Sequence, residues 1–363
     1  MTLRCTTSDD DKNEELKRLS HFLQFLRQSP HIASEIHKLA VEIITQRCLE
    51  NEDYSALADA LCSLPQLRTL ALVNVFLISS DPEQLMSVKI DHLIIRYPGL
   101  LWNNMAIGVN HLWGILALFG DISSVSIEDV HVVGGTLESS LQKSNVTALT
   151  LRQVTGLSLL LASMTALGSP LLPDLRSIDI QDLAVPTINS FLGETGKQYS
   201  YLGCSMPRAI SITDLETSPA AISTVLDLSQ CTNLRKLTFY IDLGERKDEG
   251  VWQYFSKVLD SLPLETSPHA LEKLTLSLRL HNVGFPSTIL AHGPFLDTTP
   301  SSTAVETKLL GWVEKRILLG VVVRVEALQR IRYTDRWVAA KNADFVLDLF
   351  PRLNHAGFLS LNA

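Results

Sequence analysis

The sequence lacks the usual features of proteins that bind nucleic acid, cross a membrane or are secreted. Positive charge is not in excess, because 31 Lys and Arg stand against 39 Asp and Glu, for a formal net charge of -8. Nucleic acids and anionic membranes attract basic surfaces. Residues 1–15 contain no apolar run typical of a signal peptide. We therefore expect neither a nucleic-acid nor a membrane partner.

Long uninterrupted apolar runs are also missing. The two stretches with little charge are residues 98–120, which contain three Asn and a His, and residues 154–173, which are broken by Gly156, Gly168 and Pro170. Such interruptions favour buried helices in a core over membrane-spanning helices.

Cysteine is scarce, and the five residues include no C-x-x-C pair. An odd, scattered set favours reduced thiols that act mostly as small core residues, and this predicts a cytoplasmic or nuclear protein.

Motifs for catalysis or cofactor binding are absent from the sequence. Gly193-Glu-Thr-Gly196-Lys197 resembles a phosphate-binding loop only superficially, because its spacing is wrong and Gln198 replaces the hydroxyl residue. We expect a simple loop there. The sequence has no H-E-x-x-H zinc motif and no G-x-S-x-G nucleophile turn. We therefore expect that the protein is not an enzyme and that it has no cofactor and no metal site.

What the sequence does contain is a repeated pattern, clearest at Leu67-x-x-Leu70-x-Leu72. Successive copies begin at residues 36, 67, 90, 122, 146, 175, 234 and 271. The steps are 23 to 37 residues, except one of 59 that we expect to hold a weaker copy at Ile210 and Ile212. Leucine-rich repeats have periods of about 20 to 29 residues. Alternate residues of each short strand point inward, and no single unit can bury its apolar face alone, so neighbouring units must stack.

The segments between copies have helical spacing and give the expected domain organisation. The fold class predicted is α/β, a leucine-rich-repeat-like solenoid or horseshoe with irregular repeats over residues 14–363, preceded by a disordered polar tail at 1–13. A loop rich in Pro, Ser and Thr is expected at 281–302, a further strand at 321–325, a degenerate copy at 328–333 and a final strand at 358–361. Helices are expected at 14–28, 55–64, 104–119, 136–143, 157–167, 187–191, 251–262, 305–319 and 335–349.

Several copies also resemble a known family. The segments LPQLRTLAL, LPDLRSIDI, TNLRKLTFY and ALEKLTLSL resemble the irregular leucine-rich repeats that follow the F-box in fungal F-box proteins. The opening segment RLSHFLQFLRQSPHIASEIHKLAVE resembles the part that follows the F-box in basidiomycete members. The resemblance implies a non-catalytic, substrate-recognising region of a ubiquitin-ligase subunit.

Two departures from that family are visible. Leucine-rich repeats place Asn or Cys three residues after the last strand Leu, where this chain has Val75, Val130, Val154 and Leu183. We therefore expect the turns to satisfy their backbone groups differently. No F-box precedes Leu16, which puts docking to a Skp-type adaptor in doubt and leaves open both a shortened chain and a stand-alone repeat protein.

The candidate binding residues are those that lie between the buried strand positions. Mixed charge on such a face suits a protein or peptide partner. The alternatives are a scaffold with no ubiquitin role and an enzyme whose site is assembled from distant residues. The candidate partner-binding residues are His92, Arg96, Glu128, Arg152, Asp179, Gln181, Lys236, Tyr240 and Lys273.

Overall fold

The structure is a computed structural model in which the chain forms two compact units, residues 1–178 and 179–363. The repeat pattern continues across this division and does not predict it. The residues that the structure describes are 2–5, 21–22, 24–43, 48–49, 51–77, 89–98, 106–117, 119, 121–134, 145–165, 172–181, 185–205, 225–243, 249–264, 271–280, 300–327 and 350–362.

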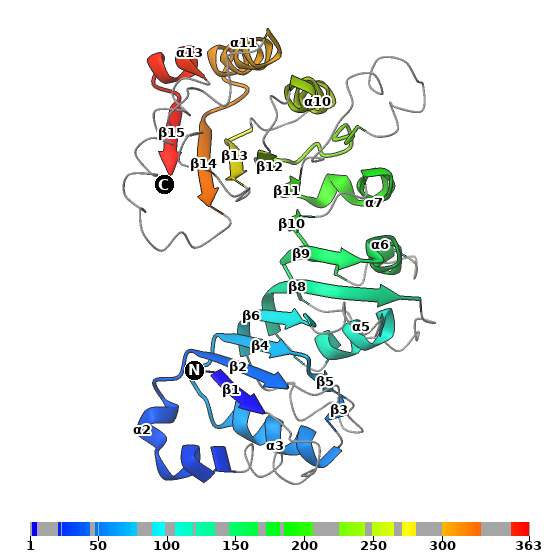
Figure 1. Ribbon diagram of the computed structural model, residues 1–363, viewed down its shortest axis with the longest axis vertical. Coiled ribbons are helices and arrows are strands. Elements are labelled where there is room, and N and C mark those ends of the chain that lie inside the picture. Colours follow the sequence, from blue (N-terminus) through cyan, green and yellow to red (C-terminus); the bar gives the residue numbers. More distant parts are fainter. Residues whose placement is uncertain are drawn as a thin grey trace, which may run out of the picture. The chain divides into compact units, whose positions relative to one another are not determined.

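Unit 1 contains a parallel sheet whose strands pair in the order of the chain (Figure 1). Its strands are β1 (Thr2–Cys5), β2 (Lys38–Ile43), β4 (Thr69–Val73), β6 (Lys89–Arg96), β8 (Asp121–Val133) and β9 (Ala148–Thr155). The helices are α2 (Pro30–Ala33), α3 (Asn51–Cys62), α5 (Val109–Ala117) and α6 (Leu157–Thr165). Two short parallel pairings lie outside this order, β3 (Cys48–Leu49) with β5 (Phe76–Leu77), and β7 (Ile107–Gly108) with β8. Strand β10 (Ser177–Ile180) spans the division between the units.

Unit 2 repeats the same arrangement of parallel strands and helices (Figure 1). Its strands β11 (Tyr201–Ser205), β12 (Lys236–Leu243), β13 (Lys273–Leu280), β14 (Val321–Ala327) and β15 (Leu359–Asn362) also pair in chain order. The helices are α7 (Val185–Thr195), the short 3-10 helix η2 (Gly196–Gln198), α10 (Glu249–Asp260), α11 (Pro300–Glu314) and α13 (Pro351–His355). The predicted α/β class with alternating strands and helices is therefore confirmed.

The repeated leucines form columns that run across the strands. In unit 1 the register aligns Leu70 with Leu93, Leu93 with Val125, and Val125 with Leu149, and all four side chains are buried. Leu237 occupies the corresponding column in unit 2, between Leu202 and Leu274. Burying one such side chain contributes about 1.5–3 kcal/mol. The columns therefore make a continuous apolar layer within each unit.

A copy that the sequence analysis did not recognise lies between those that begin at residues 175 and 234. The strand between β10 and β12 is β11, and its copy is Tyr199-x-x-Leu202-x-Cys204, with all three side chains buried. The copy was missed because a tyrosine and a cysteine occupy two of the three apolar positions. Ile210 and Ile212 lie outside the described residues.

The C-terminal copies also differ from expectation. Leu318 pairs with Leu271, and Val321 and Val323 align with Leu274 and Leu276. The run over 321–325, expected as a strand only, is thus part of a full copy that begins at Leu318. The copy expected at 328–333 lies outside the described residues.

Three further expectations need correction at their boundaries. Thr2–Cys5, within the expected disordered tail 1–13, forms β1 and pairs with β2. The expected loop 281–302 ends earlier, because α11 begins at Pro300, a residue suited to the first turn of a helix. Gly193–Lys197, expected as a loop, lies in the last turn of α7 and in η2. Residues 6–13 and 281–299 lie outside the described residues, as do the helices expected at 136–143 and 335–349.

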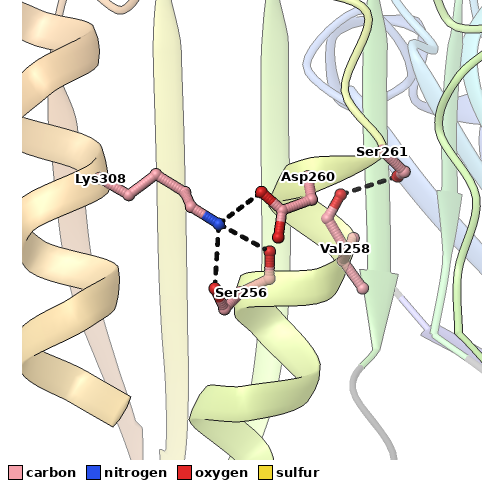
Figure 2. Close-up of polar contacts among 5 residues, drawn as sticks. All are labelled: Ser256, Val258, Asp260, Ser261 and Lys308. Atoms are coloured by element: carbon pink, nitrogen blue, oxygen red, sulfur yellow. Dashed lines mark hydrogen bonds and ion pairs between the residues drawn. The ribbon is translucent and has the colours of Figure 1, made fainter. Parts of the chain in front are cut away.

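Polar contacts join the helices of unit 2 to one another. The Lys308 ammonium of α11 reaches α10, where it donates to Ser256 O at 3.2 Å, Ser256 Oγ at 3.0 Å and Asp260 Oδ1 at 2.6 Å (Figure 2). In α11, the buried Glu306 carboxylate accepts hydrogen bonds from the backbone N–H groups of Arg352 and Leu353, at the start of α13. Each of these side chains fixes one helix against the next.

Aromatic rings fill the core beneath α10. Trp252 packs edge-on against Phe350 with ring centroids 5.6 Å apart, and Phe255 packs edge-on against Phe239 of β12 at 4.9 Å.

In the described part of the chain, no helix combines the length and apolar character needed to cross a membrane. The 98–120 and 154–173 stretches contain α5 and α6, each nine residues long and largely buried.

Candidate functional site

The outward face of each sheet is the face opposite the side chains of the leucine columns. Helical crossovers between parallel strands are nearly always right-handed, so strands in chain order carry their connecting helices on one face and leave the other available. All nine candidate residues lie on the outward face, and none of them is buried. The structure therefore brings them to one kind of surface, in two separate groups, one per unit.

In unit 1, four charged residues form a ladder across three strands. The register aligns Arg96 of β6 with Glu128 of β8, and Glu128 with Arg152 of β9. The Arg96 guanidinium pairs with the Glu128 carboxylate, and its Nε lies 3.4 Å from Asp129 Oδ2. Burial raises the pKa of Asp129, and the positive charge of Arg96 opposes this rise. Opposite charges alternate along the ladder and largely satisfy one another.

A left-handed residue within β8 places Asp129 within reach of Arg96. Asn74, Asp129 and Gln153 have left-handed backbone conformations, with φ of 56°, 54° and 54°. Each precedes one of the valines that replace the usual Asn or Cys. The Asn74 N–H donates to Arg96 O at 2.8 Å, and the Tyr97 hydroxyl donates to Val75 O at 2.6 Å. The next repeat thus satisfies the turn at Asn74 and Val75, as expected from the missing consensus residue.

His92 lies between two serine hydroxyls on the same face. Ser124 Oγ donates to Asp91 O at 3.1 Å and lies 2.7 Å from His92 Nδ1. Because the Ser124 hydroxyl proton is donated to Asp91 O, the hydrogen bond between Ser124 Oγ and His92 Nδ1 requires a hydrogen on Nδ1. Burial lowers the pKa of His92, and Glu128 partly offsets this effect. A neutral imidazole then has Nε2 as an acceptor, 3.5 Å from Ser126 Oγ.

A serine beside a histidine is also the start of a nucleophile and base pair. Here the Ser126 side chain belongs to a residue only 6% exposed, and its distance to Nε2 lies at the long limit of a hydrogen bond. These serines and His92 therefore form a network that joins β6 to β8.

In unit 2, Asp179 is the centre of a second polar cluster. The Tyr240 hydroxyl donates to Asp179 Oδ2 at 2.6 Å, and Gln181 Nε2 donates to the same oxygen at 3.3 Å. Tyr201 hydrogen-bonds to Tyr240. Burial, followed by the Asp179 charge, raises the pKa of both tyrosines, so they stay protonated and act as donors.

Gly203 leaves the space that the Asp179 carboxylate occupies. A Cβ atom at Gly203 would lie 2.6 Å from Asp179 Oδ1 and 2.8 Å from its Cγ. Those distances are shorter than real Cβ contacts. The missing side chain on β11 therefore lets Asp179 lie flat across the neighbouring strand and meet Tyr240 of β12.

Lys236 and Lys273 are the remaining candidate residues on the outward face of unit 2. They are direct partners in the register of β12 and β13, and Tyr201 of β11 aligns with Lys236. Adjacent strands lie about 4.8 Å apart, so the two lysine side chains extend from neighbouring backbone positions on the same face. Neither ammonium group takes part in a hydrogen bond or ion pair with another described residue.

No group of three or more His, Cys, Asp or Glu side chains in the described ranges is arranged to hold a metal ion. No model of a known protein family and no curated protein matches the chain. Function must therefore be inferred from the outward face itself.

Sequence reasoning missed several residues of this face. Tyr201 and Gly203 were missed because β11 was not recognised. Asp129 was missed because the left-handed turn moves it to the side of Arg96. Asn and Asp are among the residues that most readily adopt this conformation, and that preference was the available signal.

Proposed function

We propose that the chain is a non-catalytic protein-interaction module, a leucine-rich-repeat-like solenoid whose outward face binds a protein or peptide partner. By resemblance to fungal F-box proteins, the partner would be a protein recognised for ubiquitination. A scaffold with no ubiquitin role is the second form of the same proposal.

One observation carries this proposal. Polar side chains on the outward face are held in fixed positions by one another, as in the contact of the Tyr240 hydroxyl with Asp179. A rigid row of tyrosine, hydroxyl and charged groups costs little conformational entropy on binding. Tyrosine and arginine are also enriched in protein interfaces.

The proposal is further supported by how the fold is built. The leucine columns bury one face of each strand, and the polar face is left as regular rows with the spacing of the strands. Repeat proteins present extended binding surfaces of this kind. The described part of the face thus offers rows of polar side chains for contacts with a partner.

Affinity capture with outward-face variants tests the proposal. The full chain serves as bait in an extract of its own organism, next to Arg152→Ala, Tyr240→Ala and the control Glu314→Ala at the exposed end of α11. We expect both outward-face variants to lose a captured protein that the wild type and the control retain. Equal capture by all four proteins would contradict an outward binding face.

The same capture separates the two forms of the proposal. Recovery of a Skp-type adaptor together with a cullin supports a ubiquitin-ligase role. Recovery of other proteins without these two supports the stand-alone scaffold. Circular dichroism of each variant confirms that lost capture does not reflect lost folding.

A further inference from the structure

The outward face of unit 2 differs from that of unit 1 in how its charges are satisfied. In unit 1 the Arg96 guanidinium is shared between Glu128 and Asp129. In unit 2 Lys236 and Lys273 stand side by side in the register and have no acidic partner among the described residues. Like charges directly opposite each other on neighbouring strands destabilise a sheet. Unit 2 therefore carries two adjacent positive charges at a cost to its own stability.

The acidic groups closest along the chain are already engaged. Glu272, next to Lys273, accepts from Arg235 Nη1 at 3.4 Å. Asp179 accepts from Tyr240 and Gln181. Neither carboxylate forms an ion pair with Lys236 or Lys273. Both lysines therefore remain available to an anionic group from another molecule.

The neighbours of the pair make the surface suitable for a peptide. Tyr201 aligns with Lys236 in the same row and is only partly buried. A tyrosine ring supplies apolar contact area beside the two ammonium groups. Thr238 and Thr275, in the next outward row, are buried, so the contacts come from the row of Tyr201 and the two lysines. Arg324, exposed on β14, adds a third positive charge to the face.

We propose that Lys236 and Lys273 bind an acidic segment of a partner protein, in which neighbouring Glu or Asp carboxylates lie across β12 and β13. This inference rests on the proposed function and names the chemistry of the partner. A nucleic acid fits less well, because its binding relies on an extended basic surface and the whole chain has a formal net charge of -8.

A synthetic peptide with four consecutive glutamates between Gly-Ser flanks is the probe, and its four-glutamine counterpart is the control. Binding to the full chain is measured by fluorescence anisotropy at low salt. We expect the glutamate peptide to bind and the glutamine peptide to bind at least about tenfold more weakly. Raising the NaCl concentration to about 0.3 M should weaken the binding of the glutamate peptide, because salt screens exposed charges.

Lys236→Gln and Lys273→Gln should each lower the affinity for the glutamate peptide by about three- to fivefold, as expected for exposed ion pairs. The double variant should lower this affinity by about tenfold or more. Lys315→Gln, an exposed lysine after α11 in the same unit, should leave the affinity unchanged. The melting temperature of the double variant should equal or exceed that of the wild type, because a like-charge pair is removed. A loss of binding with no loss of stability separates recognition from misfolding.

Two results would overturn the inference. One is equal affinity for the glutamate and glutamine peptides, or affinities that the lysine variants do not change. The other is tighter binding of a single-stranded oligonucleotide than of the glutamate peptide, which would indicate a general polyanion site. If Tyr240→Ala still abolishes partner capture in either case, the proposed function stands and only the acidic partner is wrong.

Discussion

At the scale of single residues, backbone geometry and burial decide which substitutions this protein tolerates. Gly156, at the start of α6, has a φ of 78°, and a Cβ atom there would lie 2.2 Å from Val132 O. Gly114 lies inside α5 in the same unit, and a Cβ atom there would meet nothing within 4 Å. Gly156 therefore cannot accept a side chain without strain, whereas Gly114 has room for one.

We expect Gly156→Ala to lower the free energy of unfolding by about 1–3 kcal/mol, because the left-handed conformation and the contact with a backbone carbonyl both become unfavourable. Gly114→Ala should raise it by about 0.5–1 kcal/mol, since alanine loses less entropy in a helix. Denaturant unfolding measures both. Similar effects of the two substitutions would show that the close approach at Gly156 is wrong.

Two histidines of unit 1 should make its stability depend on pH. Burial lowers the pKa of His111 and of His92 below their ordinary value of 6.5. Between 6.5 and the lowered pKa, the unfolded chain binds more protons than the folded chain, so acidification favours unfolding. Asp129 acts in the opposite sense above pH 3.8, because its pKa is raised and the folded state binds the extra proton there.

The free energy of unfolding should therefore decrease as the pH falls from 7 to about 5. His111→Leu should make this decrease shallower. Urea unfolding at a series of pH values gives the slope. The same slope in the wild type and in His111→Leu would remove His111 as its cause.

At the scale of helices and strands, the side chains that join α10, α11 and α13 differ in burial. Glu306 is 3% exposed and accepts two backbone N–H groups at the start of α13, at 2.6 and 3.0 Å. The Lys308 side chain is 23% exposed, and Asp260, its acidic partner, is 65% exposed (Figure 2). Water can replace the contacts of Lys308 more easily than those of Glu306.

Glu306→Ala should cost about 2 kcal/mol of stability, because it leaves two N–H groups without their acceptor in a buried place. Lys308→Ala should cost no more than about 1 kcal/mol, as is typical of exposed ion pairs. Glu314→Ala, exposed near the end of the same helix, is the control and should have little effect. Chemical denaturation of the three variants compares these costs, and the opposite order would contradict the role of burial.

At the scale of the whole molecule, the chain forms two units that each have their own leucine columns. In repeat architectures, each repeat contacts mainly its neighbours, so the effect of a core substitution is concentrated around its own position. Leu237 is buried in unit 2, and Leu149 is buried in unit 1. They provide matched positions in the two units.

Leu237→Ala should destabilise the protein by about 2–5 kcal/mol through the cavity it leaves. Amide hydrogen exchange should accelerate mainly in residues 179–363, and Leu149→Ala should accelerate exchange mainly in residues 1–178. Exchange followed by peptide mass spectrometry resolves the two regions. Uniform acceleration along the chain in both variants would show that the units do not unfold separately.

The sequence by itself determined the alternation of strands and helices and the residues of most buried columns. This was possible because leucines at fixed spacing have few other ways to be buried together, as Leu70, Leu149 and Leu237 illustrate. It also determined which side chains lie on the outward face, since successive residues of a strand point to opposite faces.

Only the tertiary structure decided how those outward side chains meet. The contact of Tyr240 with Asp179 joins residues 61 positions apart in the chain and requires the space above Gly203. The pairing of Lys236 with Lys273 depends on the register of two strands separated by a helix. Such contacts are set by strand register and backbone conformation, which a local pattern of residues does not encode.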